Sequence, residues 1–227
     1  IISKNFGMKN NDGMRKAMHT DLAFGLIAGA LISIFGVCFT PFILKLMRTP
    51  LDIMENSVLY FKIYSSGLFF SVLYNIMMGI MNAVGDSRHP LYYLIISSVL
   101  NVVLDLVFIL IFHMGVGGAA LATIISQSVS VVFSAARLFK RNTIYQIKLK
   151  EIKLDMYYLK QIIRFGVPTG IQNSVIAFAN MIVQTNINTF ASSAVAASGA
   201  YSKIEGFVFL PISCFSMGLT TFIGQNL

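Results

Sequence analysis

The sequence predicts an all-α integral membrane protein, built as a bundle of membrane-crossing helices. Six segments reach about 20 predominantly apolar residues, the length that a helix needs to cross the roughly 30 Å hydrocarbon core of a bilayer. Apolar residues make up 56 % of the chain and charged residues only 11 %, whereas a soluble domain carries about 25 % charged residues. Because lipid offers the backbone no hydrogen-bond partners, runs of this length fit helices rather than barrel strands.

Local signals set the expected ends of these segments. The first is expected to end at Pro41, because proline interrupts helix hydrogen bonding. The third follows a turn in which Asp86 and Ser87 suit helix caps. The fourth opens with small residues over 115–123, which allow close helix packing, and the sixth is expected to bend near Pro211. The expected spans are residues 21–40, 58–84, 91–112, 116–139, 167–190 and 194–224.

Basic residues are divided very unequally between the two sides of the predicted bundle. If the connections alternate, one side holds thirteen Lys and Arg residues and the other holds four. Cytoplasmic loops carry the excess of basic residues, so we expect a multi-pass protein of the cell inner membrane with the larger set in the cytoplasm. The longest connection, residues 140–165, is then cytoplasmic. Its amphipathic portion, residues 155–165, is expected either to lie along the membrane surface or to extend the fifth helix.

The two ends of the chain resemble each other over five residues, 2–6 and 223–227. Repeated halves are common in secondary transporters, so this echo indicates that the chain covers about one repeat. The opening residues have no signal-peptide layout and look like the tail of a preceding helix. We therefore expect an internal piece of a longer protein.

Asp105 is the most informative single residue, because it lies inside the third apolar segment with Asn101 one helical turn before it. A carboxylate at the centre of a membrane helix costs about 2.5–3.5 kcal/mol on insertion scales. Residues four apart share a helix face, so the pair offers hard oxygen ligands to a small cation or one carboxylate to a moving proton. The alternative is a structural aspartate that hydrogen-bonds a neighbouring helix.

Three other helices carry polar faces, which predicts a shared water-filled interior. The candidate cavity residues are Tyr64, Asn75 and Asn82 on the second segment, Thr123 and Gln127 on the fourth, and Asn173, Asn180 and Gln184 on the fifth.

Other classes of function have little support in the sequence. The net charge of +8 comes from basic residues at the ends of apolar runs and not from a basic stripe on a soluble helix, so nucleic-acid binding is not expected. Cysteine and histidine residues show no metal-ligand spacing, and no cofactor is expected beyond a coupling ion. An integral membrane enzyme needs paired acids or a nucleophile with a base, and the segments contain neither.

Several motifs in order resemble the multidrug and toxic compound extrusion (MATE) transporters, over essentially the whole chain. They are Gly85-Asp86-Ser87-Arg88-His89-Pro90, Asn101-x-x-x-Asp105, Gly115-x-Gly117-Gly118-Ala119-Ala120-x-Ala122-Thr123, Phe165-Gly166-Val167-Pro168 and Gly224-Gln225-Asn226-Leu227. The resemblance implies two six-helix lobes in a V, of which this chain runs from the end of helix two to the end of helix eight. Residues 1–139 then belong to the first lobe, 140–165 connect the lobes, and 166–227 form the first two helices of the second.

The resemblance to prokaryotic members also implies a mechanism and a site. It implies export of organic cations by antiport with Na⁺ or H⁺, by a protein that acts as a monomer in the bilayer. Asn101, Asp105 and Thr123 match side-chain ligands of a cation site in the first lobe, and Ala119 matches a backbone carbonyl ligand. That site also uses an acid on helix one, which this chain does not contain, and residues 172–176 lack the Glu that some members carry in helix seven.

The main alternative inside the same superfamily is a flippase for lipid-linked oligosaccharides or polysaccharides. Such a protein needs cationic side chains in its cavity to hold a pyrophosphate. No Lys or Arg lies at the middle of an expected span, which favours the exporter of organic cations.

Overall fold

The computed structural model describes residues 1–46, 51–140, 143, 145–187 and 192–226, without the side chains of 51–53, 181, 184, 185 and 192–196. The described part is helical and contains no strand, which confirms the predicted fold class. Its elements are α1 (Ile2–Gly7), α2 (Asn11–Leu46), α3 (Leu51–Ala83), α4 (Arg88–Leu106), the π-helix η1 (Val107–Ile111), α5 (Gly115–Leu138), the 3-10 helix η2 (Leu149–Glu151), α6 (Met156–Ile187) and α7 (Ser192–Asn226).

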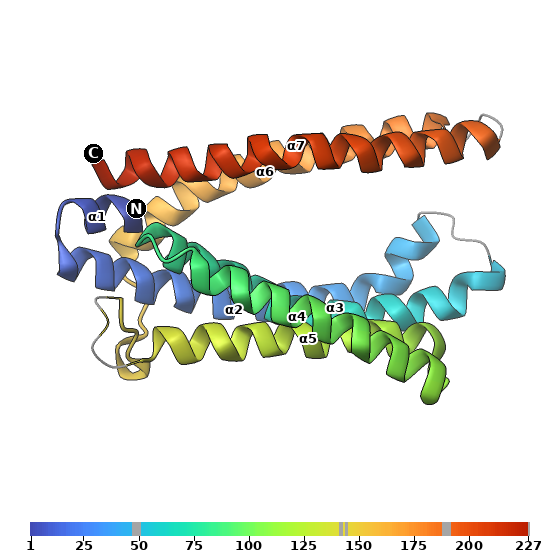
Figure 1. The fold of residues 1–227 in the computed structure, drawn as a ribbon, viewed down its shortest axis with the longest axis horizontal. Coiled ribbons are helices and arrows are strands. Elements are labelled where there is room, and N and C mark those ends of the chain that lie inside the picture. Colours follow the sequence, from blue (N-terminus) through green and yellow to red (C-terminus); the bar gives the residue numbers. More distant parts are fainter. Residues whose placement is uncertain (47–50, 141–142, 144, 188–191, 227) are drawn as a thin grey trace.

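The helices form two groups, which Figure 1 shows one above the other. Helices α2, α3, α4 and α5 pack side by side, and α6 and α7 form a long antiparallel hairpin. A methionine-rich core joins α2 to α3, with Met14, Met18, Ile80 and Met81 almost fully buried. Both chain ends lie at the same end of the molecule, which we call the basic end.

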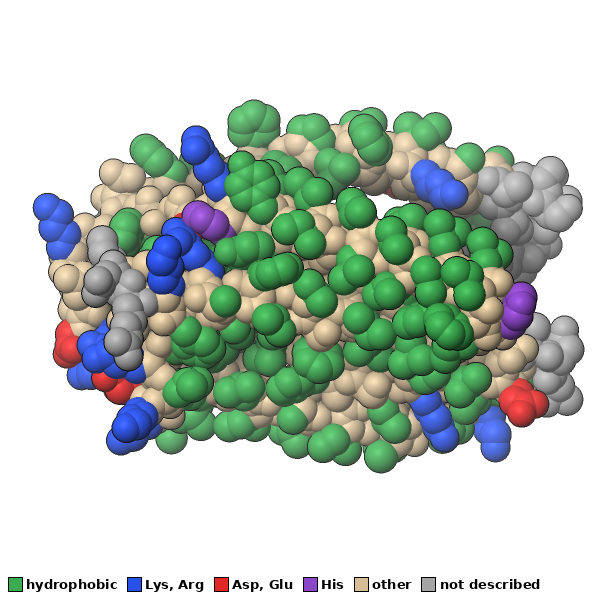
Figure 2. Space-filling model, turned by 60° about the horizontal axis from the view of Figure 1, so that its bottom comes forward, with side chains coloured by type: hydrophobic (Ala, Val, Ile, Leu, Met, Phe, Trp, Pro, Cys, Tyr) green, Lys and Arg blue, Asp and Glu red, His purple; other side chains and the backbone are tan. Residues whose placement is uncertain are grey.

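A broad apolar band surrounds the molecule between its two ends. Figure 2 shows hydrophobic side chains over the middle of the visible face and charged side chains near both ends. Large apolar residues such as Leu31, Ile34 and Leu110 keep more than 60 % of their surface exposed. Such a surface is costly in water and suits contact with lipid, so the protein is a multi-pass membrane protein.

Five helices of the described part, rather than six, are long and apolar enough to cross a membrane. Helix α6 is not among them, although it is 32 residues long. Its sequence contains Gln172, Asn173 and Asn180, and these polar residues lower its mean hydropathy. The expected fifth span, residues 167–190, includes residues outside the described part, so this expectation stays a prediction.

Two expected helix boundaries differ from the structure. Helix α2 continues through Pro41 to Leu46, and the Thr40 hydroxyl donates a hydrogen bond of 2.6 Å to the Gly36 carbonyl just before the proline. Helix α6 begins at Met156 and includes most of the amphipathic stretch. Of the two alternatives for that stretch, extension of the fifth helix is the one observed.

The two groups of helices meet only near the basic end among the described residues. The Gln225 side-chain amide donates to the Ala83 carbonyl at 2.9 Å, and the Asn82 amide lies 3.9 Å from the Met217 sulfur. A Cβ on Gly224 would lie 2.8 Å from the Ser3 hydroxyl, so the missing side chain lets α7 approach α1. Away from this end the hairpin and the other helices diverge (Figure 1).

Candidate cation-coupling site

Two side-chain hydrogen bonds fix the register between α4 and α5. The Ser97 hydroxyl donates to the Ser126 carbonyl at 2.7 Å, and the Ser130 hydroxyl donates to the Tyr93 carbonyl at 3.3 Å. The helices are antiparallel, since a short turn connects them. One and two turns beyond Ser97, the face of α4 that meets α5 carries Asn101 and Asp105.

Both of these residues contain a buried atom that lacks a hydrogen-bond partner. The atoms are Asn101 Nδ2 and Asp105 Oδ1; the others of this kind in the described part are Arg15 Nε and Ser134 Oγ. Each unsatisfied polar group costs about 1–3 kcal/mol. Each such group in a native structure needs an explanation, such as a bound water or, for the Asp105 oxygen, a cation.

The helix geometry changes directly after Asp105. Residues Val107–Ile111 form a π-helix, and the Phe112 amide bonds to the Val107 carbonyl at 3.1 Å. Single π turns inside α-helices are frequent at functional sites. The wider turn brings Phe108 against α5, where a Cβ on Gly118 would lie 3.0 Å from the Phe108 Cβ. The apolar run gives no signal of this π turn.

Helix α5 supplies the other two predicted ligands. The Thr123 hydroxyl donates to the Ala119 carbonyl at 3.1 Å, so both oxygens lie on one turn. The register of α4 against α5 places this turn near Asn101 and Asp105. Thr123 also lines a small hollow where α5 crosses α3, together with the predicted cavity residues Tyr64 and Gln127. The structure thus brings these three residues together.

The remaining predicted cavity residues are not part of this hollow. Asn75 is exposed and its amide donates to the Ser71 carbonyl of its own helix at 2.8 Å. Asn82 contacts α7 near the basic end, and Asn173 and Asn180 are exposed on α6. The side chain of Gln184 lies outside the described residues. A single interior shared by all eight residues is therefore not observed.

The donor set fits a small hard cation or a proton. One carboxylate, one amide, one hydroxyl and one backbone carbonyl provide oxygen ligands of the kind that alkali and alkaline-earth ions prefer. Within the described part no group of three or more His, Cys, Asp or Glu side chains could hold a metal ion.

A second polar cluster, at the basic end, was not found by the sequence reasoning. The Asp86 carboxylate accepts hydrogen bonds from the Tyr145 hydroxyl at 2.7 Å and from the Arg137 guanidinium at 3.2 and 3.3 Å, and it pairs with His89 at 2.5 Å. These contacts join the α3–α4 turn, the end of α5 and the inter-lobe connection. The expectation that Asp86 and Ser87 cap α4 is wrong, since Ser87 makes no capping bond and Asp86 binds these partners instead.

This cluster changes the acid–base properties of its members. Burial alone raises the pKa of Asp86, but the hydrogen bonds from Tyr145 and His89 and the neighbouring positive charges outweigh it and hold this pKa below its usual value. Burial and the bond to Asp86 raise the pKa of Tyr145 to about 12. Asp86 is therefore an ionised structural residue.

Two residues of α2, His19 and Thr20, bind the segment that connects α5 to α6. The Lys148 amide donates to His19 Nε2 at 3.1 Å, so His19 carries its proton on Nδ1, which lies 2.7 Å from the Arg15 carbonyl. The Asp155 amide donates to the Thr20 hydroxyl at 3.1 Å. The start of α6 is thereby positioned against α2.

Comparison with known proteins agrees with this fold. A profile of the MatE family matches residues 1–107. The probable multidrug resistance protein YoeA of Bacillus subtilis is 29 % identical over 234 residues, covering all of this chain and 50 % of YoeA. The chain thus spans about half the length of the curated relatives that it matches.

Solved structures of transporters are also similar to this chain in fold. An outward-facing multidrug resistance MATE transporter is 27 % identical with a TM-score of 0.90, covering 99 % of this chain and 51 % of the other. An inward-facing one is 25 % identical with a TM-score of 0.80, covering 99 % and 55 %. The proteins that match this chain over nearly its whole length are thus membrane transporters. In sequence and in fold, the chain is similar to the MATE transporters.

Proposed function

We propose that the full-length protein exports organic cations across the cell inner membrane in exchange for Na⁺ or H⁺. The observation that carries this proposal is the unpaired Asp105 oxygen, buried in an apolar helix beside the unpaired Asn101 amide. Intramembrane acids mark ion pathways and proton relays. The names of the relatives, which describe multidrug resistance and export, support the substrate class.

The arrangement of the two helix groups supports alternating access as the mechanism. They touch at the basic end through α1, α3 and α7 and diverge at the other end. This arrangement is more similar to the outward-facing relative than to the inward-facing one. Export then requires that the contacts at the basic end break while contacts at the opposite end form.

Antiport follows if cargo and ion favour different conformations. Occupation of Asp105 by Na⁺ or H⁺ removes the cost of its buried unpaired oxygen. The ion therefore stabilises the conformation that binds it most tightly. It shifts the equilibrium between the two conformations only by the difference between its affinities for them. An organic cation that binds the opposite conformation more tightly is then driven out as the ion moves in.

The experiment is transport by the full-length protein in proteoliposomes, with Na⁺ and pH gradients imposed separately. A fluorescent organic cation such as ethidium should be exported under at least one gradient and not without any. A pyrophosphate-linked lipid should not be translocated. Translocation of that lipid, without ethidium export, would support the flippase instead; for that function Lys62 and Lys203 are candidate residues, since they lie about three turns inside α3 and α7.

A further inference from the structure

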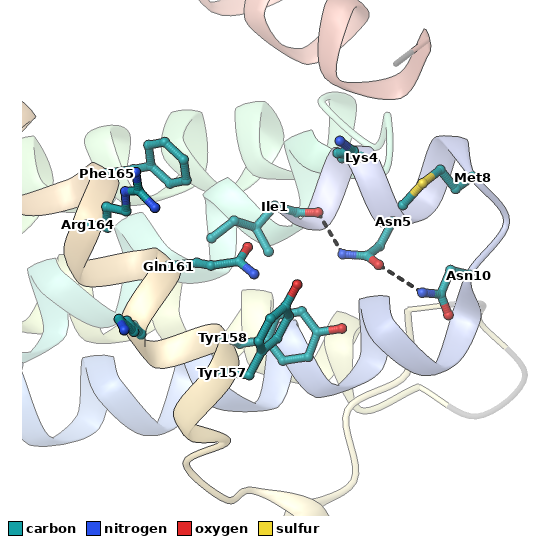
Figure 3. Close-up of a pocket in the computed structure, with 11 residues that line it drawn as sticks. Ile1, Lys4, Asn5, Met8, Asn10, Tyr157, Tyr158, Gln161, Arg164 and Phe165 are labelled. Carbon is teal, nitrogen blue, oxygen red and sulfur yellow. Dashed lines mark hydrogen bonds between the residues drawn. The ribbon is translucent and has the colours of Figure 1, made fainter.

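A large hollow lies at the basic end, between α1 and the first turns of α6. Its volume is about 720 Å³. Figure 3 shows Ile1, Lys4 and Asn5 on one side, with Tyr157, Tyr158 and Arg164 on the other. The hollow is separate from the Asn101 and Asp105 site, which lies on α4.

The hollow is positively charged and its basic residues are unpaired. Lys4, Lys160 and Arg164 line it, and no Asp or Glu of the described part does. None of the three is within 4.0 Å of a carboxylate among the described residues. Other basic residues at this end differ, since Arg15 pairs with Glu151 and Arg137 pairs with Asp86. An unpaired basic cluster around a concave surface favours an anionic ligand.

The floor of the hollow is held by a chain of hydrogen bonds. The buried Asn5 amide donates to the Ile1 carbonyl at 3.0 Å, and the Asn10 amide donates to Asn5 Oδ1 at 3.1 Å. The Gly13 amide in turn donates to Asn10 Oδ1 at 3.0 Å. The Tyr158 hydroxyl packs over Gly13, where a Cβ would lie 2.8 Å from it. Tyr158 is buried, so its side chain helps to form this floor.

The rim of the hollow has the composition of a membrane interface. Tyr157 and Phe165, which line it, keep 68 % and 63 % of their surface exposed. Tyrosine is enriched where lipid headgroups meet the acyl chains. Long Lys and Arg side chains near the ends of membrane helices reach the interface, where the headgroups lie.

We propose that this hollow binds the phosphate headgroup of an anionic phospholipid. Arg164 presents a planar fork suited to two phosphate oxygens, and Lys4 and Lys160 add two cations. The exposed Phe165 and Tyr157 lie where the glycerol backbone and the acyl chains begin. Basic pockets between membrane helices are known to hold acidic headgroups. This binding does not depend on the proposed transport function.

The test is lipid binding to the full-length protein by native mass spectrometry, with phosphatidylglycerol and phosphatidylcholine as the two probes. Wild-type protein should retain phosphatidylglycerol in preference to phosphatidylcholine. The double variant Lys160→Gln, Arg164→Gln should lose about thirty-fold in affinity for phosphatidylglycerol, because each basic residue near an anionic lipid contributes about five-fold. The matched control is Lys150→Gln, Arg88→Gln, which removes the same charges from exposed positions outside the hollow.

Three results would overturn the proposal: an unchanged affinity in the double variant, an equal loss in the control, or competition by free glycerol 3-phosphate at the concentration at which the lipid binds.

A second measurement uses wild-type protein and so does not depend on how the variants fold. A phosphatidylglycerol with a photoreactive group near its phosphate should label residues 157–165, and labelling confined to other segments would contradict the assignment.

Discussion

Asp105 and Asp86 are both carboxylates with little exposure, but their surroundings give them different roles. Asp86 has three side-chain partners, whereas Asp105 has an oxygen with none. The sequence was sufficient to find Asp105, because an acid in an apolar run is rare. It was not sufficient for Asp86, because Arg137 and Tyr145 are 51 and 59 residues away and no local spacing connects them.

The ligand set predicts that Na⁺ and H⁺ coupling respond differently to mutation. In the full-length protein, Asn101→Ala and Thr123→Ala remove oxygen ligands but keep the Asp105 carboxylate. Export driven by Na⁺ should then need about ten times more Na⁺, the effect of losing about 1.4 kcal/mol, while export driven by H⁺ should persist. Ser98→Ala, on the exposed side of the same helix, is the control. Equal loss under both gradients would argue against direct ligation by these residues.

Asp86 should stabilise the protein in its ionised form. Its pKa is lowered in the folded protein, so its contribution is present above the usual carboxyl pKa and is lost as pH falls through the lowered value. Asp86→Asn should cost about 1.5–3 kcal/mol at neutral pH, the range for hydrogen bonds to a charged group. The difference in thermal stability between variant and wild type should shrink on acidification. A difference independent of pH would exclude this role.

At the scale of the helices, apolar run length predicted their number and order but not all of their ends. Pro41 suggested a stop, yet α2 continues through it, because an apolar helix in lipid has no better partner for its backbone than the next turn. The amphipathic residues before the fifth span continue α6, since His19 and Thr20 hold the preceding connection against α2. These contacts depend on tertiary packing and leave no periodic pattern.

The crossing of α1 and α7 should control closure of the basic end. Gly224→Val places a side chain against Ser3 and should push the two groups apart, favouring an inward-facing arrangement. Gly218→Val lies on the same helix with nothing within 4 Å of its Cβ, so it is the matched control for helix propensity.

The readout is the distance between spin labels at Arg88 and Asn226, which are exposed on the two groups. This distance should increase in Gly224→Val and not in Gly218→Val. An unchanged distribution in both variants would show that this glycine does not set the closure.

For the whole molecule, the distribution of charge predicts the orientation in the membrane. In a background with Cys38 and Cys214 replaced by serine, a cysteine at Leu46 should react with an impermeant thiol reagent in intact cells. A cysteine at Lys150 should react only in inside-out vesicles. Both positions are exposed, so accessibility within the protein does not limit the reaction. Labelling of the Lys150 position from outside would reverse the orientation.

The arrangement of the two helix groups was the least predictable feature of the whole molecule. The echo between residues 2–6 and 223–227 suggested a repeat but not a contact. In the structure Ser3 and Gly224, which match in the echo, pack against each other. The sequence pattern predicts the order of the helices. The contacts between the two groups of helices depend instead on single small residues such as Gly224.

The central claim is that Asp105 couples ion entry to export of an organic cation. The most direct test is the Asp105→Asn variant of the full-length protein in proteoliposomes, under the gradient that drives the wild type. Asparagine keeps the shape and removes the charge, so gradient-driven ethidium export should disappear while the protein still inserts and folds. Glu55→Gln, which removes an exposed carboxylate outside the site, should export normally. Export by Asp105→Asn at the wild-type rate would contradict the claim.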